Sequence, residues 1–184
     1  MKHLKALIGF LVLVVLAASW SPASVVSSQT ANPAKSSLAA ALWYVATSGN
    51  DSNTCSSPAA PCATINAAIG KASPGDTVYV AEGTYTGEGT EVVLIDKNIT
   101  LSGGWNSDFT VQIGMSSIDG QGLRVGITSH FGLTADIEGF VIRNGYGSYA
   151  GGIVKSGGTM TLTNSTVSGN HGDSIGGGIY NQST

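Results

Sequence analysis

The chain has 184 residues and few charges for its length, which narrows the classes of protein that it can form. Only 10% of the residues are charged and the formal net charge is −3, which excludes a nucleic-acid-binding surface, because such a surface needs clustered lysine and arginine. Small polar residues are too abundant for a helical bundle, and 42% hydrophobic residues are too many for a disordered chain. Short strands joined by tight turns fit this balance.

The N-terminal segment 1–23 is typical of an export signal. A positively charged start precedes the apolar run 6–18, which is too short to span a bilayer comfortably. We therefore expect a protein that is secreted or held at the cell surface, with cleavage after Ala23 or near Ser19. The alternative is a membrane anchor that is never cut. The segment 24–42 shows no sustained period and is expected to form a flexible spacer.

Cys55 and Cys62 are the two cysteines of the chain, and an even number in an exported protein predicts a disulfide. The bond would close a small loop that Pro58 and Pro61 stiffen, so we expect its stabilisation at the low end of the usual range. A metal site is the alternative, but no histidine lies near the two cysteines.

Residues 64–72 are predicted to form a short amphipathic helix. Thr64 is a suitable N-cap, and a basic residue, Lys71, lies in the last turn. One apolar stripe at helical spacing consists of Ile65, Ala68, Ile69 and Ala72. The alternation around Val78 and Val80 that follows predicts a half-buried strand.

Apolar residues then recur at a nearly constant long interval. Two columns result, Leu101, Ile127, Ile153 and Ile179 in the first, and Ile95, Ile118, Ile142 and Val167 in the second. Two such columns predict a coil with at least two strands per turn, stacked in parallel so that aliphatic side chains meet in a continuous core. The competing interpretation is an antiparallel sandwich, which needs closely spaced hairpin turns and no long period.

Several segments also carry a resemblance to known proteins. "PCATINAAIGKASPGDTVYVAEGTYTG", followed by "KNITLSGGW", resembles the opening of right-handed parallel β-helix proteins of the pectin-lyase-like superfamily. "GTMTLTNSTVSGN" and "GGGIYN" resemble the repeats of polymorphic outer membrane proteins, although Gly178 replaces the usual alanine and Val167 the usual phenylalanine. The resemblance covers 43–184. It implies an all-β fold, a right-handed single-stranded parallel β-helix, with the helix at 64–72 lying across its N-terminal end.

The resemblance divides this region into an N-terminal cap, 43–76, and coils, 77–184. We expect the coils to be incomplete at the C-terminus, because "GGGIYN" opens a coil that the chain does not finish. A C-terminal membrane anchor would then lie beyond the chain. Unpaired backbone groups beside Val167 and Ile179 would favour self-association through this open edge.

One line of polar residues is a candidate for catalysis. Asp96, Asp119, Arg143 and Ser168 each follow an apolar column residue, and are predicted to lie side by side on an outward face. Such a line can bind a uronate or a cation such as calcium, and otherwise we expect no metal and no cofactor. The alternative is an ordinary solvated face. "DGQGLR", 119–124, invites comparison with the Asp, Gln and Arg of pectin methylesterases, but here the three residue types share one turn.

A second candidate site is a set of loops on one side of the coil. The separation between the two columns grows steadily from the Ile95–Leu101 interval to the Val167–Ile179 interval, so the extra residues must bulge outward. Tyr146 and Tyr149, in "RNGYGSYAGG", are predicted to lie on that side and to stack on sugars or contact a partner. The alternative is that they pack a glycine-rich loop.

Three further polar residues are expected to be structural. His171, in "NHGD", is expected in a polar turn. Asn144 and Asn170 are expected in strand-to-turn positions that suit left-handed backbone.

Two functional hypotheses follow. The first is a secreted or cell-surface β-helix repeat protein with a structural, adhesive or glycan-binding role, whose partner is a polysaccharide or cell-surface glycan. The second is a carbohydrate-active enzyme, a polysaccharide lyase, glycoside hydrolase or pectinesterase, or a fragment of one. An acid/base cluster spanning several coils would distinguish them, and the sequence offers Asp96, Asp119 and Arg143 alone. We therefore expect the first function and no catalysis.

Overall fold

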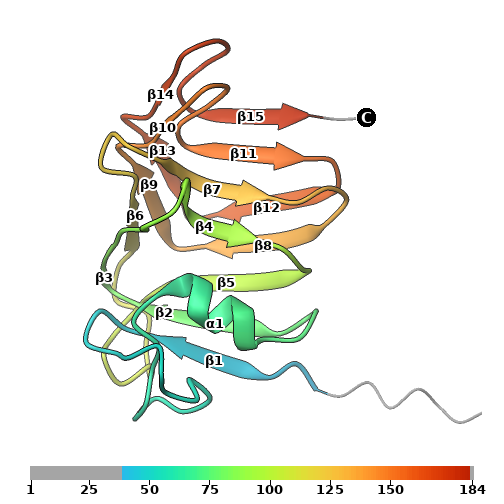
Figure 1. Cartoon of the computed structure of the whole chain (residues 1–184). Coiled ribbons are helices and arrows are strands. Elements are labelled where there is room, and N and C mark those ends of the chain that lie inside the picture. Colours follow the sequence, from blue (N-terminus) through green and yellow to red (C-terminus); the bar gives the residue numbers. More distant parts are fainter. Residues whose placement is uncertain (1–38, 183–184) are drawn as a thin grey trace, which may run out of the picture. The chain divides into compact units, whose positions relative to one another are not determined.

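The computed structural model of the chain describes residues 39–182 (Figure 1). The signal peptide predicted at 1–23 and the spacer up to residue 38 lie outside the described residues. The described elements are β1 (Leu42–Val45), α1 (Ile65–Lys71), β2 (Thr77–Ala81), β3 (Gly83–Tyr85), β4 (Glu91–Ile95), β5 (Ile99–Trp105), β6 (Ser116–Asp119), β7 (Val125–Ser129), β8 (Thr134–Glu138), β9 (Phe140–Arg143), β10 (Tyr146–Gly147), β11 (Ile153–Ser156), β12 (Thr159–Thr163), β13 (Thr166–Ser168), β14 (His171–Gly172) and β15 (Ile179–Gln182).

Three parallel sheets form the body of the described fold, and the chain visits them in a fixed order. Sheet A contains β1, β2, β5, β8 and β12, sheet B contains β3, β6, β9 and β13, and sheet C contains β4, β7, β11 and β15. The strands of each sheet pair in parallel with the strands one coil before and after them. The described part of the chain therefore makes four coils, each with one strand in every sheet. The predicted parallel β-helix is confirmed and the antiparallel sandwich is wrong.

The core consists of three columns of apolar side chains, one from each sheet. The columns are Val78, Leu101, Ile137 and Leu162 in sheet A, Tyr85, Ile118, Ile142 and Val167 in sheet B, and Val93, Ile127, Ile153 and Ile179 in sheet C. The aliphatic members in the first three coils are at most 1% exposed. Burying one such side chain contributes about 1.5–3 kcal/mol, so the columns supply much of the stability of the fold.

The two predicted columns are right for their last three members and wrong for their first. Leu101 lies in sheet A, and Ile95 lies in sheet C, where it pairs with Ser129. The true first members are Tyr85 in sheet B and Val93 in sheet C. The cause is the loop 106–115, which lengthens the second coil between β5 and β6 and so shifts the period of the sequence.

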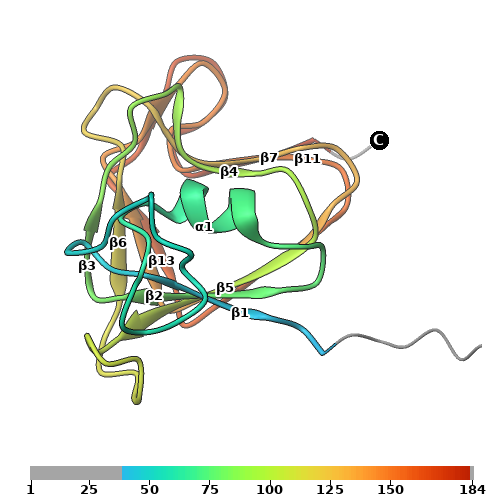
Figure 2. The same cartoon turned by 60° about the horizontal axis from the view of Figure 1, so that its bottom comes forward.

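The helix α1 covers the end of the stack at β1 and β2, where Figure 2 shows it within the outline of the coils. Thr64 is its N-cap, because the threonine hydroxyl accepts a hydrogen bond from the backbone N–H of Ala67 at 3.1 Å. Ile65 and Ile69 are 2% exposed and belong to the same core cluster as the sheet columns. The predicted helix and its apolar stripe are confirmed. Strand β1 begins at Leu42, the last residue of the predicted spacer.

Cys55 and Cys62 form the predicted disulfide. Both residues are fully buried in the core cluster. The loop that they close lies along β1, where the backbone N–H groups of Tyr44 and Ala46 donate to the carbonyl oxygens of Cys55 and Cys62 respectively. This loop therefore pairs backbone groups of β1, the outermost strand of sheet A, that sheet A itself leaves unpaired.

The last coil has open outer edges in the described part of the chain. β12, β13 and β15 each pair with a strand on one side, and residues 39–182 supply none on the other. Ile179 is consequently 54% exposed, whereas Ile153, its neighbour in the column, is fully buried. Self-association through these edges stays a prediction.

Candidate functional site

The corner between sheets B and C is where the coils differ most regularly in length. Its four segments are 86–90, 120–124, 144–152 and 169–178, and we call them the loop corner. The separation between the sheet B and sheet C columns increases with every coil, from Tyr85–Val93 to Val167–Ile179. The predicted growth therefore holds, although its first interval is Tyr85–Val93 and not Ile95–Leu101. Figure 2 shows these segments projecting together on one side of the coils.

Two stacked pairs of aromatic rings lie on the loop corner or directly next to it. Tyr146 stacks on His171 with 5.7 Å between ring centroids, and Tyr149 stacks on Tyr180 at 4.9 Å. The ring planes are nearly parallel, at 10° and 15°. Tyr146 is 40% exposed and Tyr149 52% exposed. Fixed tyrosine rings with one wet edge are typical of surfaces that bind sugars or proteins.

The first ring pair is held by backbone pairing and by a carboxylate. Residues 146–147, β10, pair in parallel with residues 171–172, β14. The Tyr146 hydroxyl donates to one oxygen of Asp173 at 2.7 Å, and Nε2 of His171 lies 3.5 Å from the other. The hydrogen bond to Asp173, together with the charge of that carboxylate, raises the pKa of Tyr146. Tyr146 is therefore a neutral phenol at physiological pH.

Part of the predicted catalytic line forms beside this ring pair. Asp119, Arg143 and Ser168 are neighbours across β6, β9 and β13. Nε of Arg143 lies 3.3 Å from the Asp119 carboxylate. The same carboxylate accepts from the side-chain amide of Asn144 at 3.0 Å and from the backbone N–H of Gln121 at 2.9 Å. The Asp119 carboxylate is therefore already engaged by three donors of the protein.

Asp96 does not belong to this line, so the predicted placement is wrong. It follows β4 in sheet C, and its carboxylate lies 3.6 Å from the ammonium group of Lys97. The error has the same origin as the misplaced Ile95, which immediately precedes it. Asp96 and Asp119 therefore do not form a shared cation site. Among residues 39–182 no group of three or more His, Cys, Asp or Glu side chains is arranged to hold a metal ion.

An open cleft of about 550 Å³ lies on the loop corner next to the ion pair. Its polar and aromatic lining comes from three successive coils and consists of Asp119, Gln121, Asn144, Tyr146 and His171, with glycines at 122, 145 and 169. The segment 120–124 is shorter than 144–152 and 169–178. Tyr146 and His171 come from the two longer segments, and Gln121 comes from the shorter one.

Asn170 fixes the third and fourth coils to each other at this corner. Its side chain donates to the carbonyl oxygen of Ile142 at 3.0 Å and accepts from the backbone N–H of Gly145 at 2.7 Å. A side chain at Gly145 would clash with the carbonyl oxygen of Gly151, so glycine is needed for this close approach. The predicted structural role of Asn170 holds, although the left-handed residue at this turn is Gly169.

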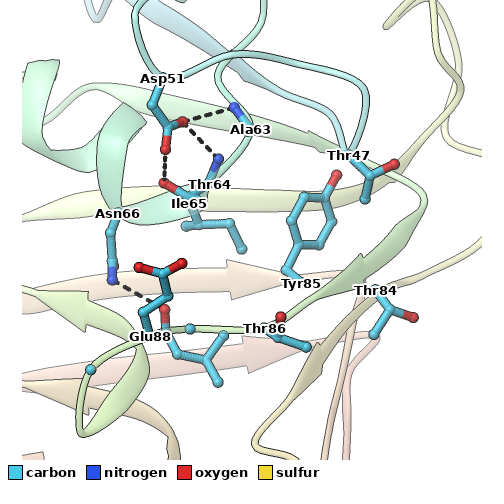
Figure 3. A pocket seen from close by; sticks show the side chains of 13 residues that line it. Thr47, Asp51, Ala63, Thr64, Ile65, Asn66, Thr84, Tyr85, Thr86 and Glu88 are labelled. Atoms are coloured by element: carbon cyan, nitrogen blue, oxygen red, sulfur yellow. Dashed lines mark hydrogen bonds between the residues drawn. The ribbon is translucent and has the colours of Figure 1, made fainter.

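A second cleft, of about 520 Å³, lies between the N-terminal part of α1 and the segment 86–90 of the first coil (Figure 3). Asp51 lies at its rim, and its carboxylate accepts from the backbone N–H groups of Ala63 and Thr64 at 2.8 and 2.9 Å. A third bond, from the Thr64 hydroxyl at 2.9 Å, completes this set. Asp51 therefore holds in place the residues that directly precede α1, Ala63 and Thr64.

Other polar groups of this second cleft also serve the cap. Asn66 donates to the carbonyl oxygen of Val92 at 3.1 Å and accepts from the backbone N–H of Leu94 at 2.9 Å, so it joins α1 to β4. The Tyr85 hydroxyl donates to the carbonyl oxygen of Ala81 at 2.9 Å, and burial raises the pKa of this phenol. The Asn66 contacts fasten the cap to the first coil and the Tyr85 bond lies within that coil, so we regard the loop corner as the better candidate for ligand binding.

The structure brings together some residues that the sequence reasoning did not assign to the site. Gln121 and Asn144 line the cleft with Tyr146, and Asp173 holds the tyrosine hydroxyl. Tyr180 was not predicted at all. The repeat itself could have identified His171. His171 follows the column residue Val167 at the same distance as Tyr146 follows Ile142, so the two occupy equivalent positions in successive coils.

None of the helical structure in residues 39–182 is long and apolar enough to cross a membrane.

Comparisons with other proteins identify a family but no activity. No curated protein and no solved structure matches the chain. One family model, described as a protein of unknown function, matches residues 47–184, which is more than half of the sequence. The chain therefore belongs to the DUF1565 family.

Proposed function

We propose that this chain is an exported β-helix protein that binds glycans through its loop corner and carries out no catalysis there. The observation that carries the proposal is the set of exposed, stacked aromatic rings beside an open cleft. The sequence resemblance to the pectin-lyase-like superfamily and to polymorphic outer membrane protein repeats is part of this proposal. Export is supported by the signal-like residues 1–23 and by the disulfide, which persists in oxidising compartments.

The aromatic rings supply the kind of surface that a sugar needs. A pyranose has an apolar face of C–H groups and a rim of hydroxyls, so it matches a flat ring with polar groups at its edge. Tyr149 and Tyr180 provide the larger ring pair, and Tyr146 carries its hydroxyl next to Asp173. Stacking between coils holds the rings in place before a ligand arrives, which lowers the entropy cost of binding.

The carboxylates of the loop corner support binding rather than hydrolysis. Glycosidases use a pair of carboxyl groups that flank the scissile bond, one of which must be free to carry a proton. Here Asp119 is paired with Arg143, and Asp173 accepts from the Tyr146 hydroxyl. Both carboxylates are therefore committed to partners within the protein.

A panel of soluble polysaccharides and oligosaccharides tests the proposal. We expect the wild-type protein to bind at least one glycan, and Tyr149→Ala to weaken that binding about tenfold or more, because buried aromatic contacts dominate such interfaces. Phe131→Ala is the matched control, because this ring is 66% exposed but lies between β7 and β8, away from the loop corner. Equal loss in both variants, or binding to no glycan, would contradict the proposal.

The enzymatic alternative has its own readout. Polygalacturonate is incubated with the protein with and without calcium, and unsaturated product is followed by its ultraviolet absorbance. We expect no product. Product that disappears in Asp119→Ala or Arg143→Ala would show instead that the ion pair is catalytic.

A further inference from the structure

The loop corner also contains evidence about the charge of its ligand. We propose that the cleft takes an uncharged sugar, a hexose or an N-acetylated amino sugar, and not a uronate. This inference rests on the proposed glycan-binding function and names the class of glycan. It depends on which polar groups of the cleft are already paired within the protein and which remain available.

Each charged group in the cleft or next to it has a partner within the protein. The Arg143 guanidinium lies 3.3 Å from Asp119, and His171 lies 3.5 Å from Asp173. Arg124, next to the cleft, donates through Nε to the carbonyl oxygen of Gly89 at 3.1 Å. These two arginines and two carboxylates balance each other in charge. A uronate chain, with one negative charge per sugar, would find no excess of positive charge among them.

Two neutral amides that line the cleft each have a group left available. Gln121 accepts from Nη1 of Arg124 at 2.8 Å through its carbonyl oxygen, and its amide nitrogen makes no hydrogen bond to another described residue. Asn144 donates through its amide nitrogen to Asp119, and in residues 39–182 no donor is bonded to its carbonyl oxygen. These two amides thus offer the cleft one unpaired neutral donor and one unpaired neutral acceptor. A sugar hydroxyl can serve both, and so can the amide of an N-acetyl group.

Backbone geometry holds these two side chains at the cleft. Gln121 has φ 56° and Asn144 has φ 51°, in the left-handed region that residues other than glycine seldom adopt. They are two of the five non-glycine residues with positive φ in the described part of the chain. Such conformations persist where the surroundings fix them, and they concentrate at functional sites. The Tyr146 ring, adjacent in the same cleft, supplies a surface for the face of the sugar.

The test compares four hexasaccharides of equal length, built from glucose, mannose, N-acetylglucosamine or galacturonic acid, by isothermal titration calorimetry at low and high sodium chloride. We expect at least one uncharged hexasaccharide to bind at least about tenfold more tightly than hexagalacturonate. Its affinity should change by no more than about twofold with salt, because no ion pair with the ligand is screened.

The variant Gln121→Glu tests whether the ligand binds in the cleft. The variant keeps an acceptor for Arg124 but removes the amide donor, so affinity for the uncharged sugar should fall about tenfold, as for one lost hydrogen bond. Gln182→Glu makes the same change of charge at the end of β15, outside the cleft, and should bind as the wild type does. Thermal unfolding of both variants verifies that the fold is intact.

The possible outcomes separately test the charge of the ligand, its placement in the cleft and the glycan-binding function itself. Tighter, salt-sensitive binding of hexagalacturonate would overturn the inference and leave the glycan-binding function standing. Binding of an uncharged sugar that Tyr149→Ala abolishes and Gln121→Glu leaves unchanged would overturn the placement in the cleft. Absence of binding to all four sugars and to the wider polysaccharide panel would remove the proposed function itself.

Discussion

The indole Nε1 of Trp43 donates a hydrogen bond to the carboxylate of Asp76 at 2.9 Å, which fastens β1 to the turn before β2. The same carboxylate accepts from the backbone N–H groups of Ala41 and Ser73, both at 2.8 Å. Burial opposes ionisation of Asp76, but the three hydrogen bonds outweigh it and hold the pKa of this carboxyl below its usual value.

This lowered pKa predicts a pH dependence of stability. The contribution of Asp76 is complete above the unfolded pKa, near pH 4, and is lost as the pH falls through the lower folded pKa. Asp76→Asn should lower the free energy of unfolding by about 1–3 kcal/mol at neutral pH and make stability less dependent on pH in acid. Urea unfolding at several pH values measures both effects. An unchanged acid slope in the variant would show that other carboxylates determine it.

A second prediction concerns the link between the first coil and the cap helix. The ammonium group of Lys97 donates to the carbonyl oxygens of Ile69 and Ala72 at 2.9 and 3.2 Å, at the C-terminal end of α1. Lys97→Met keeps the apolar stem and removes these bonds, so the free energy of unfolding should fall by about 1–2 kcal/mol. Asp96→Asn removes only the ion pair with Lys97, in which the Asp96 side chain is 43% exposed, and should change the free energy of unfolding by less than about 0.5 kcal/mol. Equal effects would assign the stabilisation to the ion pair.

Asn170 gives a third prediction, for the loop corner. Asn170→Ala leaves the carbonyl oxygen of Ile142 and the N–H of Gly145 without their partner, both in the third coil. We expect the free energy of unfolding to fall by about 2 kcal/mol, measured by chemical denaturation. Ser168→Ala, at an exposed position shortly before it, should be nearly neutral. If the two variants were alike, Asn170 would not hold the coils together.

The outer edges of the last coil give a fourth prediction. Backbone amides beyond Thr161 should exchange with solvent faster than those of Val78–Val80, because the described residues provide no strand beyond β12, β13 and β15. The protein should also associate through these edges in a concentration-dependent way, detectable by sedimentation, and Ile179→Lys should weaken this association. A stable monomer with equal protection in both regions would show that the edge is closed.

The sequence alone predicts the cap helix and the disulfide correctly, because both depend on local patterns. It was insufficient for sheet A, whose column members are unevenly spaced, with a much longer interval between Leu101 and Ile137 than between the other neighbours in the column. The long interval contains the loop 106–115, and no local pattern distinguishes that insertion from the rest of a coil. The spacing between Leu101 and Ile127 coincides with the period of the sheet C column, so periodicity alone aligns Leu101 with the wrong sheet.

The candidate site, like the fold, is predictable from the sequence only in part. Tyr146 and His171 occupy equivalent positions in successive coils, so a correct register is enough to pair them. Tyr149 lies in the loop before its column residue Ile153, whereas Tyr180 directly follows Ile179. Their stacking depends on how each loop folds back, which periodicity does not encode. The same is true of the available amide groups of Gln121 and Asn144, which depend on the contacts of neighbouring side chains.

The segments of the loop corner change in length without a change in the core, so ligand recognition is separated from folding. Residues added between a sheet B strand and the following sheet C strand leave the three core columns in register, as the segments 120–124 and 144–152 already demonstrate. Recognition can therefore diversify at this corner at little cost to folding. Transplanting a foreign loop between Arg143 and Ile153 is the natural way to engineer a new ligand specificity on this protein.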